Sequence, residues 1–211
     1  KDATSALATA WVESTPFALE DSIIYQVMVD RFANDSGSLE VPKSASARAG
    51  GTLRGITGAI ERGQFQAVGA NTLWLSPLYR NPTGLFADGD GNQYSSYHGY
   101  WPVASRELEP LLGSERDFDA LIASAHAHGL RVVVDVVPNH IHAEHPRWRE
   151  RTSDRGFNRA DGRCICGTPA CGWAEHIREC WFAPYMPDLD WNQPDVARTG
   201  VEDVAWWIDR F

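Results

Sequence analysis

The fold is decided by the stretch Leu130–His140, which reads LRVVVDVVPNH. Its apolar residues follow one another without alternation, which is typical of a parallel strand whose two faces are both covered by helices. Three polar side chains, Asp135, Asn139 and His140, lie at its carboxyl end. In α/β barrels the functional groups lie at that end of the strands. The stretch therefore predicts a buried parallel strand over 130–137 with a candidate site directly after it.

Two earlier runs also predict buried strands. Residues Ile23–Val29 read IIYQVMV, and residues Ala70–Pro77 read ANTLWLSP, where the final proline ends the strand. A weak helical stripe of apolar residues lies between these runs, and a longer helix is predicted before the third strand. That helix begins at Ser114, a favourable N-cap followed by acidic residues, and ends at Gly129.

A final amphipathic helix is predicted from Pro194 onward. The element order is then strand, helix, strand, helix, strand, a long insertion, and helix, which is typical of a parallel sheet. The strands begin about 50 to 60 residues apart, so eight units would need roughly 400 residues, the scale of a decorated barrel. We therefore predict an α/β fold that is the N-terminal portion, about three β/α units, of an incomplete (β/α)8 TIM barrel. A loop-rich subdomain is inserted after the third strand.

The sequence pattern divides the chain into four segments. Residues 1–21 are an exposed lead-in, and 22–140 carry the first three strands of the barrel. Residues 141–190 form the inserted domain, and 191–211 form the helix before a fourth strand that lies outside this sequence. The chain begins at Lys1 without the apolar core of a signal peptide, so we expect a processed or trimmed N-terminus.

Composition excludes several classes of protein. The 211 residues are 43% hydrophobic and 22% charged and include nine tryptophans, which excludes disorder as the main state. The net charge of −9 argues against a nucleic-acid-binding protein. No run approaches the roughly 18 apolar residues that a membrane span needs.

Four cysteines, Cys164, Cys166, Cys171 and Cys180, fall within 17 residues. An even and local set indicates two disulfides, which form in an oxidising compartment. Cys164 and Cys166 are too close to pair with each other, so each is expected to pair with Cys171 or Cys180. A four-thiolate zinc site and free thiols are the alternatives, although the usual C-x2-C spacing of zinc sites is missing.

Five motifs in a fixed order resemble the α-amylase family, glycoside hydrolase family 13, and the resemblance covers residues 20–211. The motifs are Tyr25–Phe32 and Leu73–Pro77 for the first two strands, the aromatic motif Tyr97–Trp101, the D-x-x-x-N-H motif Asp135–His140, and Met186–Asp190, which ends the family's inserted domain.

The resemblance implies roles for residues around the substrate. Tyr100 matches a tyrosine that stacks on the sugar beside the cleaved bond, and His140 matches a histidine that hydrogen-bonds that sugar. His98 and Trp101 are expected to flank the same subsite, although core packing is the alternative for Trp101. Asp135 matches a structural position at the strand end.

The resemblance also implies metal sites. Asn139 and Asp188 match positions that bind a structural calcium ion between the barrel and the inserted domain, a role that suits their oxygen atoms. Asp30, Asn34 and Asp35 match a loop that holds a second calcium in some bacterial relatives. Two weaker features are read as not binding metal: the solvated turn Asp88–Asn92 and four histidines expected at the surface of a helix and loops, namely His126, His128, His142 and His145.

The activity implied is that of a secreted enzyme that hydrolyses α-1,4-glucosidic bonds in starch or maltodextrin by a retaining mechanism. Met186–Asp190 reads as in the α-amylases rather than the α-1,6-glucosidases. The family's catalytic carboxyl groups follow the fourth, fifth and seventh strands, so this chain is expected to contain none and to be inactive alone. Its partner would be an α-glucan. A transglycosylase or α-glucosidase of the same family, and a non-catalytic sugar-binding or structural remnant, are the alternatives.

Overall fold

A three-stranded parallel sheet organises the molecule. The computed structural model describes residues 18–88 and 90–211, so most of the predicted lead-in lies outside the described residues. The strands β1 (Ile24–Val27), β2 (Thr72–Leu75) and β7 (Arg131–Val134) lie in the order β1-β2-β7. All three run parallel, so their carboxyl ends share one edge of the sheet.

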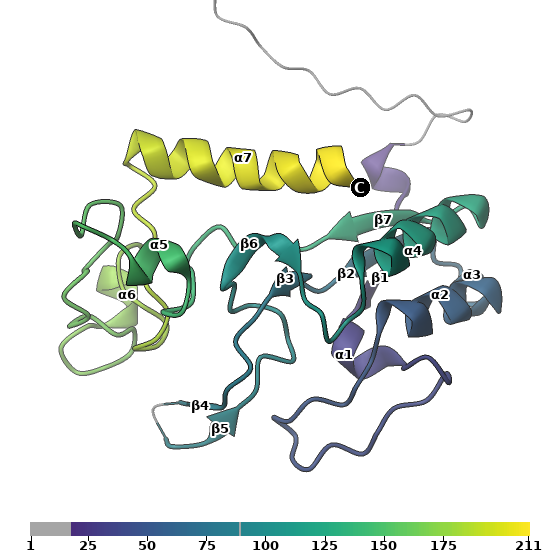
Figure 1. Ribbon diagram of the computed structural model, residues 1–211, viewed down its shortest axis with the longest axis horizontal. Coiled ribbons are helices and arrows are strands. Elements are labelled where there is room, and N and C mark those ends of the chain that lie inside the picture. Colours follow the sequence, from purple (N-terminus) through teal and green to yellow (C-terminus); the bar gives the residue numbers. More distant parts are fainter. Residues whose placement is uncertain (1–17, 89) are drawn as a thin grey trace, which may run out of the picture.

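Helices and two short antiparallel strand pairs complete the structure, and Figure 1 shows their arrangement. In chain order these elements are η1 (Leu19–Asp21), α1 (Val29–Phe32), α2 (Leu53–Glu61), α3 (Gln64–Ala67), β3 (Tyr79–Arg80), β4 (Phe86–Ala87), β5 (Gln93–Tyr94), β6 (Ala104–Leu108), α4 (Glu115–Ala127), α5 (Pro146–Arg149), α6 (Trp173–His176) and α7 (Pro194–Arg210).

The two faces of the sheet differ in their burial. The register places Val27, Leu75 and Val134 in one row, and this row faces the main hydrophobic core beneath α2 and α4. The next row is Gln26, Trp74 and Val133, in which Trp74 is 38% and Val133 is 45% exposed. One face is therefore packed and the other is open.

The expectation that helices cover both faces of 130–137 is therefore wrong. The continuous apolar run of this strand suits a closed barrel, in which the second face lines an interior. Here β1 and β7 each have one neighbouring strand within the described sheet, so that interior is open. An open partial barrel confirms the predicted fold class.

The strands are shorter than predicted. The first ends at Val27 instead of Val29, because the chain turns at once into α1. The backbone N–H of Val29 donates a hydrogen bond to Oγ of Ser76, at 3.1 Å, which ties this turn to the end of β2. Similarly, β7 ends at Val134, and residues 135–137 leave the sheet.

The two long helices form as the sequence predicts. Ser114 caps α4, since its side chain accepts from the backbone N–H of Asp117 while Asp117 accepts from that of Ser114. This reciprocal pair satisfies free N–H groups at the helix start. The last helix, α7, begins at Pro194, whose missing N–H is harmless at the first position of a helix. Figure 1 shows α7 running along the top of the view, above β6 and β7.

Residues 141–190 contain little regular structure, as expected of the loop-rich insertion. They include the two four-residue helices α5 and α6 and are cross-linked by disulfides Cys164–Cys171 and Cys166–Cys180. This pairing confirms disulfides over zinc or free thiols. The segment lies on the side toward which β7 points (Figure 1).

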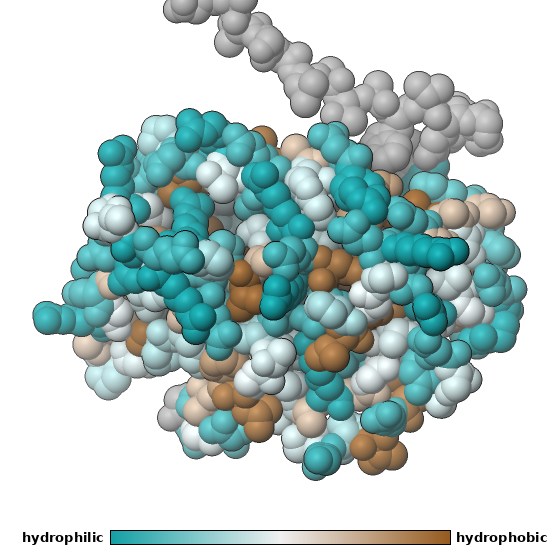
Figure 2. Space-filling view, viewed as in Figure 1, coloured by the Kyte–Doolittle hydropathy of each residue, from teal (hydrophilic) through white to brown (hydrophobic). Residues whose placement is uncertain are grey.

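Figure 2 shows a mostly hydrophilic face with hydrophobic residues gathered in small areas. No helix in the described part of the chain is long and apolar enough to cross a membrane.

Candidate functional site

Tyr100, Asp135 and His140 come together at the carboxyl edge of the sheet. The hydroxyl of Tyr100 donates to a carboxylate oxygen of Asp135 at 2.6 Å. Asp135 directly follows β7, and its backbone N–H still donates to the carbonyl of Leu75 in β2. Burial, together with the hydrogen bond and charge of Asp135, raises the pKa of Tyr100 to about 12. The half-buried phenol therefore stays protonated, with its orientation fixed by Asp135.

The aromatic motif is held against the end of β2 by tight backbone contacts. Gly99 has a positive φ of 85°, and a β-carbon there would lie 2.2 Å from the carbonyl oxygen of Pro77. The buried side chain of Asn81 bridges the motif, because its amide donates to the carbonyl of Gly99 and its oxygen accepts from the N–H of Trp101. No sequence motif points to Asn81, because its role depends on backbone groups that are distant in the chain.

His98 and Trp101 flank Tyr100 in different ways. The ring of His98 lies 5.7 Å from that of Tyr100, nearly parallel at 26°, and its Nδ1 accepts from the N–H of Tyr100. Burial, with the nearby charge of Arg48, lowers the pKa of His98 to about 4. Trp101 is only 6% exposed and packs in a cluster with Ala183 and Met186. Its position is that of a core residue.

His140 is buried at 6% exposure and both of its ring nitrogens have protein partners. Nε2 lies 3.0 Å from the carbonyl oxygen of Tyr100, and Nδ1 lies 3.3 Å from the side-chain amide nitrogen of Asn139. These contacts fit a neutral ring with its proton on Nε2. Burial lowers the pKa of His140, which also favours the neutral form. The sugar contact of His140 stays a prediction, and it requires Nε2 to exchange its carbonyl partner.

Asn139 and Asp188 lie together, as predicted, and join the sheet to the inserted segment. The amide nitrogen of Asn139 donates to Asp188 at 2.8 Å, and that of Asn158 donates to the other oxygen of Asp188, also at 2.8 Å. A bridge between His140 and Asp188 pairs the two backbones. Burial raises the pKa of Asp188 to about 6, against the opposing effect of its two amide donors. No sequence motif points to Asn158, which only the fold brings to Asp188.

The chemistry of this cluster fits a calcium ion. One carboxylate, which is 3% exposed, and two carboxamides supply hard oxygen donors, the ligand type that calcium takes. The amide nitrogens of Asn139 and Asn158 now face Asp188, so an ion would require both amides to present their oxygens instead. Within residues 18–88 and 90–211, no group of three or more His, Cys, Asp or Glu side chains is placed to hold a metal.

The structure does not assemble the second predicted calcium site. Asp30 is buried and accepts from the backbone N–H groups of Ala49 and Gly50. The side-chain oxygen of Asn34 accepts from Ser36 and Ser38, and Asp35 accepts from Thr52. Each side chain thus serves a different loop or helix contact, and the binding of one ion by all three stays a prediction. In the weaker loop, Asp88 accepts from Asn92, while residue 89 lies outside the described part.

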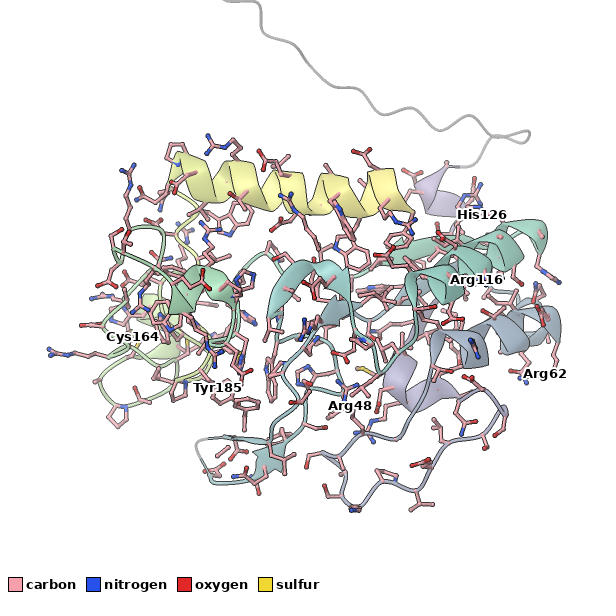
Figure 3. All side chains as sticks on the ribbon, viewed as in Figure 1. Arg48, Arg62, Arg116, His126, Cys164 and Tyr185 are labelled. Carbon is pink, nitrogen blue, oxygen red and sulfur yellow. A yellow bond between two sulfur atoms is a disulfide. The ribbon has the colours of Figure 1, made fainter. Side chains whose placement is uncertain are left out.

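The prediction that four histidines lie at the surface is right for two of them and wrong for the other two. His126 and His128 are exposed on or beside α4, as predicted. His142 is 1% exposed, because its ring packs against Phe86 and Tyr185. His145 is half-buried and caps α5. Figure 3 shows Tyr185 on the side of the inserted segment that faces the hairpin of β4 and β5.

These histidines predict acid sensitivity. Burial lowers the pKa values of His98, His142 and His145 to about 4, from the ordinary value of about 6.5. In the unfolded chain these histidines therefore become protonated near pH 6.5, whereas in the folded chain they stay neutral until the pH falls to about 4. Each histidine then removes up to about 1.4 kcal/mol of unfolding free energy per pH unit as the pH falls through this window, and stability is complete above it.

The measurement is the thermal midpoint of the complete protein from pH 8 to pH 4. The slope of the unfolding free energy against pH gives the number of protons taken up on unfolding, and His142→Gln is expected to lower that number by about one. His126→Gln, at an exposed position, is the matched control and should leave the slope unchanged. Equal slopes in wild type and His142→Gln would contradict the assignment.

A cavity of about 480 Å³ lies away from Tyr100 and His140, between α7, β6 and the chain after β7. Its lining includes Ser105, Val136, His145, Trp191 and Asp203. None of the predicted substrate residues lines it. The candidate sugar site at the strand ends is therefore separate from this cavity.

Comparison with known proteins agrees with this arrangement. Residues 26–210 match the family described as "Alpha amylase, catalytic domain". "Alpha-amylase 2" of Dictyoglomus thermophilum is 31% identical over 196 residues, which cover 93% of this chain and 31% of the relative. "Cyclomaltodextrin glucanotransferase" of Geobacillus stearothermophilus is 34% identical, over 89% of this chain and 29% of the relative.

A solved structure shows the same architecture. The alpha-amylase from Geobacillus thermoleovorans, complexed with acarbose, superposes with a TM-score of 0.74 at 26% identity. The match covers 92% of this chain and 39% of that enzyme, so this chain spans well under half the length of the proteins it resembles. Since the family match covers nearly all of the described residues, the chain belongs to the α-amylase family, glycoside hydrolase family 13.

Proposed function

We propose that this chain is the N-terminal part of the catalytic domain of an enzyme that cleaves α-1,4-glucosidic bonds in starch or maltodextrin. The observation that carries the proposal is the cluster of Tyr100, Asp135 and His140 at the carboxyl edge of a family-type sheet. Tyr100 offers a fixed aromatic face for a sugar ring, held in place by its bond to Asp135. The alpha-amylases among the relatives support α-glucan as the substrate class.

The retaining reaction needs a nucleophile and an acid about 5 Å apart. The carboxylates nearest the candidate site are already engaged, since Asp135 accepts from Tyr100 and Asp188 accepts from two asparagines. We propose that the catalytic carboxylates belong to barrel strands outside residues 1–211. The open sheet and the small share of each relative that is covered support this assignment.

The test compares the complete protein with residues 1–211 alone, using soluble starch and a chromogenic maltoside. The complete protein is expected to release reducing ends with retention of the α configuration. Residues 1–211 alone are expected to release none, because they lack the paired carboxylates. Turnover by a folded, monomeric 1–211 chain would contradict this placement of the catalytic groups.

A transglycosylase is the second candidate, because two of the relatives at 34% and 35% identity are cyclomaltodextrin glucanotransferases. Both reactions proceed through the same covalent glycosyl-enzyme, which either water or a sugar hydroxyl can attack. Product analysis distinguishes them. Cyclic or lengthened glucans from a maltodextrin would identify a transglycosylase, and short linear sugars a hydrolase.

We further propose that Asn139, Asp188 and Asn158 hold a calcium ion that ties the inserted segment to the sheet. An ion bound only by the folded state stabilises it by mass action, about 2.7 kcal/mol at a hundredfold excess over Kd. Millimolar calcium is therefore expected to raise the thermal midpoint of the complete protein above its value in EGTA.

Two variants make this prediction specific. Asp188→Asn should abolish the calcium-dependent shift, whereas Asp154→Asn, at an exposed position in the same segment, should keep it. Equal midpoints with calcium and with EGTA in the wild type would argue against the site.

The two disulfides support a further proposal, that the protein is secreted into an oxidising compartment.

A further inference from the structure

A stacked pair of exposed aromatic rings lies beside the candidate site. Trp173, at the start of α6, is 49% exposed, and Phe182 is 42% exposed. Their ring centroids lie 5.7 Å apart, with an angle of 24° between the planes. The ring of Phe182 also lies 5.5 Å from that of His140, at 89°. The pair therefore extends the surface around His140 onto the inserted segment.

The disulfides fix the backbone beneath both rings. Trp173 lies two residues after Cys171, and Phe182 lies two residues after Cys180, so each ring follows a cross-linked cysteine. Between them Trp181 is buried, and its indole N–H donates to the carbonyl of Asn158 at 2.8 Å. A surface held in this way loses little conformational freedom when a ligand covers it.

These two rings are packed less completely than their aromatic neighbour in the segment. The neighbouring Trp181 places its ring against that of Trp148 and away from solvent. Trp173 and Phe182 contact each other instead and remain nearly half exposed. Exposed apolar surface beside a binding site is typical of contact with a ligand. Flat aromatic faces suit the apolar C–H face of a pyranose, and a neutral glucan needs no ionic partner.

We propose that Trp173 and Phe182 form an additional glucan subsite, which binds a glucosyl unit further along the chain from the sugar beside His140. This inference rests on the proposed α-glucan activity, which it extends to a preference for longer substrates. The disulfides then act as the scaffold of the subsite.

The test measures kcat/KM of the complete protein on linear maltooligosaccharides from maltotriose to maltoheptaose. In Trp173→Ala the gain in kcat/KM that accompanies one added glucose unit is expected to fall by about 2- to 10-fold, the worth of one aromatic stacking contact. The shortest substrate that is cleaved should keep its wild-type kcat/KM. Trp173→Phe, which retains a flat ring, should restore most of the gain.

Ile177→Ala is the matched control, because Ile177 is exposed to 48% just after α6 but has no flat face. Trp173→Leu provides an apolar, non-planar side chain if the alanine variant folds poorly, and it should behave as the alanine variant does. A length series in Trp173→Leu identical to wild type overturns the subsite and leaves the α-glucan activity standing. Failure of the wild type to cleave or transfer any α-glucan overturns both proposals.

Discussion

His140→Ala in the complete enzyme is expected to lower kcat on starch by about 100-fold or more, the effect of removing one hydrogen-bond donor that acts in a transition state. The imidazole contributes one N–H, which in this structure faces the carbonyl oxygen of Tyr100 at 3.0 Å. A sugar that displaces this contact would receive a donor already aligned by its surroundings. Because the bond is expected to tighten in the transition state, kcat and kcat/KM should fall together.

The measurement must separate this effect from simple loosening, since His140 is buried against Phe182 and the backbone of Tyr100. The thermal midpoint of His140→Ala is recorded with the kinetics, and His140→Gln tests whether a donor alone restores turnover. His128→Ala is the control, because His128 is exposed and its Nδ1 lies 2.8 Å from the carbonyl oxygen of Ser124 in α4, away from the sheet's carboxyl edge. Unchanged kcat in a folded His140→Ala would remove the sugar contact from the site.

Local patterns predicted the elements that depend on local chemistry. The cap at Ser114 and the proline start of α7 act through neighbouring backbone groups, so sequence alone places both helices well. The close spacing of the four cysteines likewise left only two disulfide pairings, and the structure contains one of them. The family motifs located Asn139 and Asp188 together, although 49 residues separate them.

Sequence predicted less well where burial depends on distant partners. The run 130–137 has apolar residues on both faces, but only its register with β2 shows which face meets the helices. His142 follows a polar motif, and only the fold brings Phe86 and Tyr185 around it. Asn34 and Asp35 have suitable oxygens for calcium, yet each is used by a nearby hydroxyl group. Competition for a polar group cannot be read from spacing alone.

Gly99→Ala is expected to destabilise the complete protein by about 3 kcal/mol or more and to abolish most activity. A positive φ of 85° disfavours any side chain, at about 1 kcal/mol. The added β-carbon would also lie 2.2 Å from the carbonyl oxygen of Pro77, closer than any real contact allows. Since Gly99 sits between His98 and Tyr100, relief of this clash must move these two candidate sugar-binding residues away from the end of β2.

Gly129→Ala separates the two causes of that loss. Gly129 has a similar positive φ of 72°, but a β-carbon there meets nothing within 4 Å. This variant should therefore lose only the backbone contribution, about 1 kcal/mol, and keep its kcat. Chemical denaturation and starch hydrolysis of the two variants give the comparison. Equal losses of stability and activity would show that the approach of Gly99 to Pro77 does not position the site. A larger loss confined to Gly99→Ala would show that the close contact at the end of β2 orients Tyr100 toward Asp135.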